Sequence, residues 1–199
     1  MVVVEEIAGS RRAKKPNGYK VAGKNRVTLR AHAEQLLPLL RQEGCYNTGR
    51  GPDFLNTTHL LENVLQRAGY SFHPDDSGSL QQTVAFAVPE QKLIVIREDI
   101  YDALLDDDPF ARYTVVHEFS HIFLQHAVTL HRNAILGDHH WWEDSEWQAN
   151  NLAAEILMPV EVVRRLGGKP LLIQAACGVS SKAAGYRVDN LKREGVLSD

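Results

Sequence analysis

Two histidines and one glutamate lie within five residues of each other, in the segment HEFSH at positions 117–121. Residues four positions apart on an α-helix are offset by only about 40°, so His117 and His121 would project from one face and could bind one metal ion together. Glu118 would be offset by about 100° from His117, which places its carboxylate beside the ion rather than on it. A carboxylate there can take a proton from a water molecule that zinc has made acidic. The spacing therefore predicts two zinc ligands and a general base.

The third zinc ligand must come from another part of the chain, and the helix predicted over residues 143–158 is its expected source. Glu146 lies on one helical stripe with small alanines, which would allow this helix to approach the HEFSH helix closely. Glu155 is about 180° from Glu146 around the helix, so we expect it on the solvated side. Asn150, one turn after Glu146, is expected to form a hydrogen bond to one of the metal ligands without contacting the metal itself.

Four residues near the start of this helix are alternatives to Glu146 as the third ligand. Glu143 and Asp144 are acidic, although acids at a helix start also stabilise the helix dipole without binding a metal. His139 and His140, in the preceding loop, are weaker alternatives.

His126 is close to the motif in sequence but is not expected to be a ligand. The motif helix is predicted to run from about Pro109 to His126, because three acids precede a proline at its start. On such a helix His126 is about 180° from His117 and faces away from the metal. We expect it to be a packing residue or a hydrogen-bond partner of a ligand.

The other elements predict an α+β fold that is mostly helical. Two short β-rich runs, TVAFAV and KLIVI, are separated by PEQ and predict a hairpin or two adjacent strands. Hydrophobic residues at helical spacing predict helices over residues 29–40 and 58–68. The last 40 residues are predicted to be helical, with breaks at residues 167–170 and at Gly178.

Length and composition indicate one globular domain with appendages. The chain has 199 residues and a formal net charge of -3, which gives no overall attraction to nucleic acid. Cys45 and Cys177 match no metal-binding spacing and are expected to be reduced thiols. The first residues do not resemble a signal peptide, and no apolar run approaches the roughly 18 residues that span a bilayer. We therefore expect a soluble cytoplasmic protein without a membrane partner.

Three regions are predicted along the chain. Residues 1–28 form a basic tail, since seven Lys or Arg and no acid lie between positions 9 and 26. We expect this tail to be a mobile, solvated arm rather than a binding segment. Residues 29–160 form the domain that carries the metal site, and residues 161–199 form a C-terminal helical segment.

The sequence RYTVVHEFSHIFLQH followed by EWQANNLAAEILMP resembles the ImmA/IrrE metallopeptidases. In that family an HExxH helix is followed by a Glu-x-x-Ala helix that ends in Leu-Met-Pro. The resemblance covers roughly residues 58–191 and implies a zincin-like domain of the gluzincin type with one zinc ion per chain. It implies that His117, His121 and Glu146 bind the zinc and that Glu118 is the catalytic base.

This chain departs from the family pattern at two positions. Gln148 replaces an acid that many members have, which leaves Glu146 as the residue able to bind the metal. Ser120 replaces a glycine that often precedes the second histidine, and it is still small. Family enzymes typically cleave a helix-turn-helix repressor, so the resemblance implies limited proteolysis of a separately encoded repressor. For stabilising the oxyanion, Tyr113, Arg112 and the loop histidines are candidates.

The segment IQAACGVSSKAAGYRVDNLKREG has the rhythm of a helix-turn-helix. Residues 178–180 would form the turn, and the following helix carries Lys182, Arg187 and Lys192. Direct contact with DNA is possible, but Gln174 occupies a position that is usually a small alanine in such motifs. We favour packing of this segment against the catalytic domain.

The alternative interpretation is a DNA-binding or partner-binding regulator with a structural zinc and latent or absent peptidase activity. A structural zinc usually has four protein ligands and no open position. The presence of Glu118 favours the catalytic interpretation, because a structural site has no use for a base.

Overall fold

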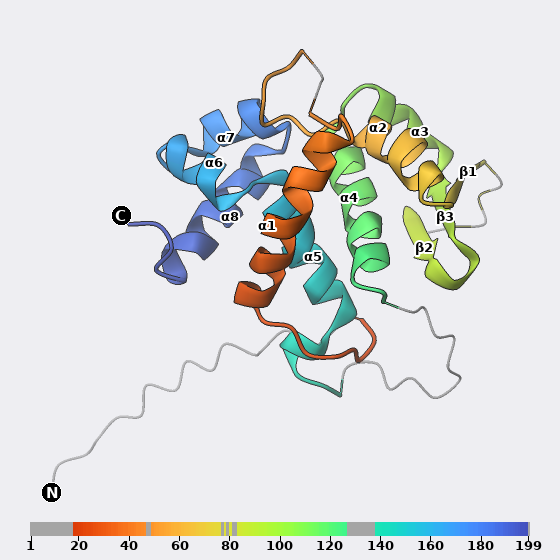
Figure 1. The fold of residues 1–199 in the computed structure, drawn as a ribbon, viewed down its shortest axis with the longest axis horizontal. Helices are drawn as coiled ribbons and strands as arrows, with labels where there is room; N and C mark the ends of the chain where they lie inside the picture. The colour runs from red at the N-terminus through yellow and green to blue at the C-terminus, as the bar shows by residue number, and fades with distance from the viewer. Residues whose placement is uncertain are drawn as a thin grey trace, which may run out of the picture.

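The computed structural model describes residues 18–46, 49–76, 78, 80, 83–126 and 138–198. Within these ranges the chain is mostly helical with one small three-stranded sheet (Figure 1), which confirms the α+β prediction. Helices α1 (Arg26–Gln42), α4 (Pro109–Phe123) and α5 (Ser145–Leu157) lie at the centre (Figure 1). The sheet is on one side of them, and helices α6 (Val160–Arg165), α7 (Pro170–Cys177) and α8 (Ser181–Arg193) are on the other. No helix among the described residues is long and apolar enough to cross a membrane.

The sheet is formed by β1 (Ser71–Asp75), β2 (Ala85–Val88) and β3 (Leu93–Arg97), in the order β1-β3-β2. β3 pairs with β2 in antiparallel and with β1 in parallel orientation. The predicted hairpin is therefore confirmed, with β2 at the edge of the sheet. β1 was not predicted because its sequence SFHPD lacks the β-branched residues typical of strands and contains a proline. Proline is tolerated there because β1 is the other edge strand.

Helices α4 (Pro109–Phe123) and α5 (Ser145–Leu157) are packed against each other at the centre of the fold (Figure 1). Asp108 caps α4 by accepting hydrogen bonds from the backbone of its first turn, and Pro109 occupies the first helical position, as predicted. Asp144 caps α5 in the same way. The predicted end of α4 at His126 is wrong: the helix ends at Phe123, and Gln125 turns the chain back with a left-handed φ of 53°.

Helix α1 (Arg26–Gln42) confirms the first predicted helix and packs on α5. The second predicted helix consists of α2 (Thr57–His59) and a π-helical stretch (Leu60–Leu65). Helix α3 (Glu98–Leu105) was not predicted, because it follows β3 directly and no side chain caps its start.

The C-terminal part contains α6 (Val160–Arg165), α7 (Pro170–Cys177) and α8 (Ser181–Arg193), with the predicted breaks between them. Gly178 ends α7 with a left-handed φ of 64°, and a Cβ atom at this position would lie 2.3 Å from Cε2 of Phe54. Only glycine fits there. Residues of all three helices belong to the same hydrophobic core as α1, α4 and α5, so this part packs on the rest of the chain.

Residues 18–25, here called the N-terminal strap, lie against the start of α5 (Figure 1). The backbone N–H of Gly18 donates to Asp144 Oδ2 over 2.8 Å, and the N–H of Val21 donates to the carbonyl of Glu143 over 2.7 Å. The N–H of Ser145 donates to the carbonyl of Tyr19 over 3.0 Å. The prediction of a mobile tail over residues 1–28 is therefore wrong for residues 18–28. Residues 1–17 lie outside the described part of the chain.

Candidate active site and metal centre

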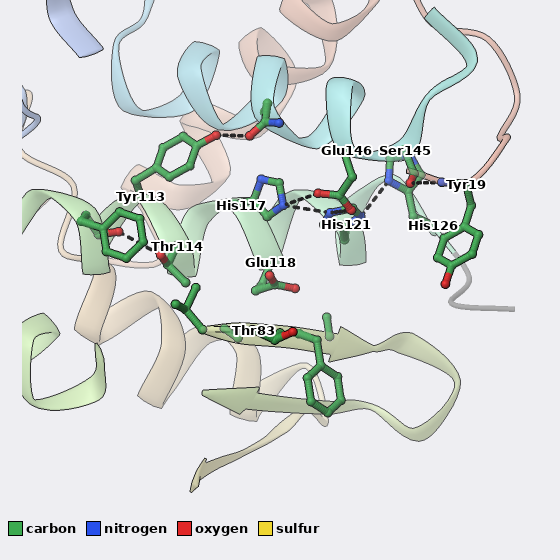
Figure 2. A pocket seen from close by; sticks show the side chains of 16 residues that line it. Tyr19, Thr83, Tyr113, Thr114, His117, Glu118, His121, His126, Ser145 and Glu146 are labelled. Carbon is green, nitrogen blue, oxygen red and sulfur yellow. Dashed lines mark hydrogen bonds and ion pairs between the residues drawn. The ribbon is translucent and has the colours of Figure 1, made fainter. Parts of the chain in front are cut away.

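Three side chains from α4 and α5 bring their donor atoms together (Figure 2). Nε2 of His117 and Nε2 of His121 are 3.0 Å apart. The carboxylate of Glu146 lies 3.2 Å from His117 Nε2 and 3.3 Å from His121 Nε2. All three donor atoms lie within 4.8 Å of one another, so this group could hold a metal ion. Two imidazoles and one carboxylate are the ligand set of catalytic zinc sites that keep one position open.

The two helices position this group through their local sequence. His117 and His121 lie one turn apart on the face of α4 that meets α5. Glu146 is in the first turn of α5, and the alanines one and two turns further, Ala149 and Ala153, are completely buried. The predicted stripe of small residues therefore lies inside the fold, where it allows the helices to approach closely.

The four alternative ligands are engaged elsewhere. The carboxylate of Asp144 caps α5, accepts from Gly18 and lies 3.1 Å from Nε2 of His139. Glu143 accepts a hydrogen bond from the backbone of His140, whose ring stacks on Trp142 at 4.2 Å between centroids.

The charges in the group influence one another strongly. Burial by itself would raise the pKa of Glu146, but hydrogen bonds and charge from His117 and His121 outweigh it and hold that pKa well below its usual range. Burial lowers the pKa of His117, yet the opposing effects of Glu146 and Glu118 raise it overall. The Glu146 carboxylate and the His117 imidazole thus favour each other's charged forms.

Glu118 lies beside the metal-binding group and not in it. Its side chain projects from α4 toward β2, whereas the two histidines project toward α5 (Figure 2). Burial raises the pKa of Glu118, while the charges of His117 and His121 and a backbone hydrogen bond from Ala87 oppose this rise. A buried carboxyl with a raised pKa next to a metal-binding group is suited to accept and donate a proton as a general base.

A cleft of about 450 Å³ opens in front of these residues. One wall is β2 with the residues just before it, and the opposite wall is formed by α4 and α5. Tyr19 of the N-terminal strap also lines the cleft. It was not predicted, because an aromatic residue within a basic run gives no signal that the run folds back onto a site.

Two of the predicted supporting residues, Tyr113 and Asn150, lie at the site. Both line the cleft, and the hydroxyl of Tyr113 donates a hydrogen bond to Oδ1 of Asn150. Asn150 also contributes, after larger effects, to the raised pKa of His117. Burial, together with the charge of Glu146, raises the pKa of Tyr113 to about 12. The hydroxyl therefore keeps its proton and remains able to donate.

Arg112, the other oxyanion candidate, does not reach the cleft. Its guanidinium is completely buried and donates to the carbonyls of Cys177 and Gly178 over 3.1 and 3.0 Å. It also stacks on Phe54, with 3.8 Å between the guanidinium carbon and the ring centroid. Arg112 thus joins α4 to the end of α7, and its predicted role at the oxyanion is corrected to a structural one.

His126 was expected to face away from the metal, which is wrong, but the expectation that it is a packing residue or a hydrogen-bond partner of a ligand is confirmed. Because α4 ends early, the His126 ring lies against His121, with 3.1 Å between their Nδ1 atoms. Nε2 of His126 lies 3.1 Å from Oε1 of Gln148. Burial, with a smaller effect from His121, lowers the pKa of His126 to about 4.

A family model described as the IrrE N-terminal-like domain, from a peptidase family, matches residues 84–189. The chain belongs to the ImmA/IrrE family. The matched region begins one residue before β2 and ends within α8, so it includes Glu118 and all three residues of the metal-binding group. A comparison with curated proteins found no match. Membership of a peptidase family agrees with a metal-binding group that faces a cleft.

Proposed function

We propose that this ImmA/IrrE protein is a zinc-dependent endopeptidase that cleaves a folded protein substrate at a small number of positions. The observation that carries the proposal is the geometry of the cleft: His117, His121 and Glu146 form one group, and Glu118 stands next to it without belonging to it. A site that only stabilises the fold would have four protein ligands and no need for the adjacent carboxyl.

The chemistry follows from these positions. A zinc ion held by the three ligands supplies polarisation of a peptide carbonyl and makes a water molecule acidic near neutral pH. Glu118 takes a proton from the attacking water and delivers it to the nitrogen of the leaving amine. The hydroxyl of Tyr113, which stays protonated, is our candidate for stabilising the oxyanion by exchanging its hydrogen bond to Asn150 for one to the substrate.

The edge strand β2 provides a place for the substrate backbone. β3 is its one partner among the described strands, and its other side faces the cleft. An extended polypeptide can add to such an edge through backbone hydrogen bonds. The backbone N–H of Ala87 in β2 bonds to the carboxyl of Glu118, the proposed base. A substrate chain aligned along β2 would therefore present a peptide carbonyl of its own close to Glu118.

The substrate we propose is a separately encoded helix-turn-helix repressor in the cytoplasm, in line with the activity that the family resemblance implies. A folded protein enters a cleft of this kind only through an exposed loop or linker, which limits cleavage to few positions. The alternative, a DNA-binding regulator, receives less support. Arg187, one of the four basic residues of α8, the helix that would contact DNA, is buried in an ion pair with Glu155.

The test is to incubate the zinc-loaded protein with the repressor encoded beside it in the genome and, separately, with casein. One or two discrete repressor fragments, absent with the Glu118→Gln variant, are the expected result. Efficient digestion of casein into many peptides, with the repressor cut no faster, would contradict the proposal of a selective endopeptidase.

A further inference from the structure

Behind the metal-binding group, buried side chains form a hydrogen-bonded chain that begins at Gln148. This side chain is completely buried, and its Nε2 donates to the carbonyl of Ala22 over 2.9 Å and to that of Trp142 over 2.8 Å. A carbonyl can only accept, and a primary amide has two N–H donors, so both donors are used. The amide orientation is thereby fixed, because a rotated amide would place its oxygen against two carbonyl oxygens. Oε1 of Gln148 must therefore face His126 as an acceptor.

The acceptor on Gln148 determines where His126 carries its hydrogen. Nε2 of His126 lies 3.1 Å from that oxygen, so this nitrogen carries the N–H that donates to it. In a neutral imidazole the other nitrogen, Nδ1, is then an acceptor. It lies 3.1 Å from Nδ1 of His121. The hydrogen of this contact therefore belongs to His121, which donates through Nδ1.

We infer that Gln148 and His126 are positioning residues that hold His121 in the single tautomer able to bind the metal. With its hydrogen on Nδ1, His121 has its free lone pair on Nε2, the atom that faces His117 and Glu146. The opposite tautomer would direct an N–H at the ligand position and block it. The inference concerns the same site as the proposed function and rests on it.

The backbone supports the same contact. The N–H of His126 donates to the carbonyl of His121 over 2.9 Å, and the N–H of Gln125 donates to that of Ile122 over 3.0 Å. These two bonds form a Schellman motif, which normally has glycine at the left-handed position. Here Gln125 adopts the left-handed conformation with a φ of 53°. His126 is thus tied to His121 by both its backbone and its ring.

The chain also connects the metal site to the N-terminal strap. Ala22 lies in the strap, and Trp142 lies just before α5. Both carbonyls that orient Gln148 therefore come from the place where the strap pairs with the start of α5. Residues that orient metal-bound histidines in this way typically change metal affinity by 10–100-fold when removed.

The test compares His126→Gln, which keeps an acceptor for the His121 N–H, with His126→Leu, which removes it at similar size. Both are made in the Glu118→Gln background, and zinc affinity is measured by competition with a chelator. We expect zinc to bind about 10–100-fold more weakly to the His126→Leu variant. The His126→Gln variant should stay within about threefold of the parent. His73→Leu, at an exposed position on β1, is the matched control and should not change the affinity.

Two spectroscopic measurements separate positioning from packing. ¹⁵N chemical shifts of the metal-free parent should show the hydrogen of His121 on Nδ1 and that of His126 on Nε2. The visible spectrum of bound Co²⁺ should change in His126→Leu and be restored in His126→Gln. Equal weakening in both variants, or the opposite tautomer, would overturn the inference while leaving the proposed function intact. Failure of the parent and the His73→Leu control to bind zinc or Co²⁺ would overturn both.

Discussion

Glu155 on α5 and Arg187 on α8 form a buried ion pair that joins the two helices. Each side chain is 5% exposed, and both guanidinium Nη atoms donate to the carboxylate, Nη1 over 2.9 Å. Arg30 of α1 donates to the same carboxylate over 3.1 and 3.2 Å. Glu155 was predicted to be solvated, but it is the acceptor through which three helices are connected. Because α5 also carries Glu146, this network helps to fix the position of a metal ligand.

Removal of the Glu155 carboxylate should destabilise the fold. Glu155→Ala leaves the buried Arg187 with the carbonyl of Met158 as its acceptor, so we expect a loss of about 3–5 kcal/mol in the free energy of unfolding. The control is Glu43→Ala, which breaks an ion pair with Arg67 whose side chains are 46% and 55% exposed. That variant should lose less than about 1 kcal/mol. Urea denaturation measures the free energy of unfolding of both variants. Similar losses would show that the buried ion pair stabilises the fold no more than the exposed one does.

Glu118→Gln should separate catalysis from metal binding. The amide keeps the size of the side chain but cannot accept the proton, so peptide hydrolysis should fall by roughly 10²–10⁴-fold. Elemental analysis should still find about one zinc per chain, because Glu118 is outside the group of ligands. Loss of zinc together with activity would identify Glu118 as a ligand instead.

Glu146 and Glu143 provide a direct comparison of two acids near the start of α5. Glu146→Ala removes one of three ligands and should weaken zinc binding steeply. Glu143→Ala removes a contact to Lys20 and to the backbone of His140, and zinc affinity should change little. Chelator competition measures the zinc affinity of both variants. An equal loss of affinity in the two would show that Glu146 is not the third ligand.

What the sequence predicted correctly depends on local spacing. The four-residue separation of His117 and His121, and the stripe containing Glu146, follow from helix geometry alone. The predictions that were wrong have two causes. Some depend on contacts between segments that are distant in the sequence, and others depend on local signals that are weak. The strap pairs with residues more than 100 positions away, and Glu155 is buried by arginines from α1 and α8. The end of α4 was missed because glutamine, rather than glycine, adopts the left-handed turn.

The two cysteines should resist alkylation in the folded protein. Cys45 and Cys177 are completely buried and unpaired, and burial raises their pKa from 9.0 to about 11 and about 12. At pH 8 the fraction of reactive thiolate should therefore fall by at least about 100-fold relative to the protein unfolded in urea. A chromogenic thiol reagent measures the rate at which the two cysteines react. A fast reaction without denaturant would contradict the burial of the thiols.

The same thiols should make stability depend on pH. They remain protonated in the folded protein while they ionise in the unfolded chain above about pH 9. The stability that they contribute is present below pH 9 and is lost as pH rises toward 11. The free energy of unfolding should fall by up to about 1.4 kcal/mol per pH unit for each thiol in this window. The Cys45→Ala, Cys177→Ala double variant should show a flatter dependence in urea titrations at pH 8, 9 and 10.

Gln125→Gly should stabilise the protein without changing the metal site. Gln125 is exposed, so its side chain contributes little packing, and its left-handed φ of 53° costs a residue with a Cβ atom about 1–2 kcal/mol. Glycine removes that strain but loses more backbone entropy on folding, which leaves a net gain of about 0.5–1 kcal/mol. For a chain of this size the midpoint of thermal unfolding should rise by roughly 1–4 °C.

Gln125→Ala is the control: it keeps the Cβ atom and should not produce the gain in stability. Zinc affinity should equal that of the parent in both variants, because the turn still presents His126 to His121. A gain in Gln125→Ala as large as in Gln125→Gly would show that the backbone at this turn is not strained.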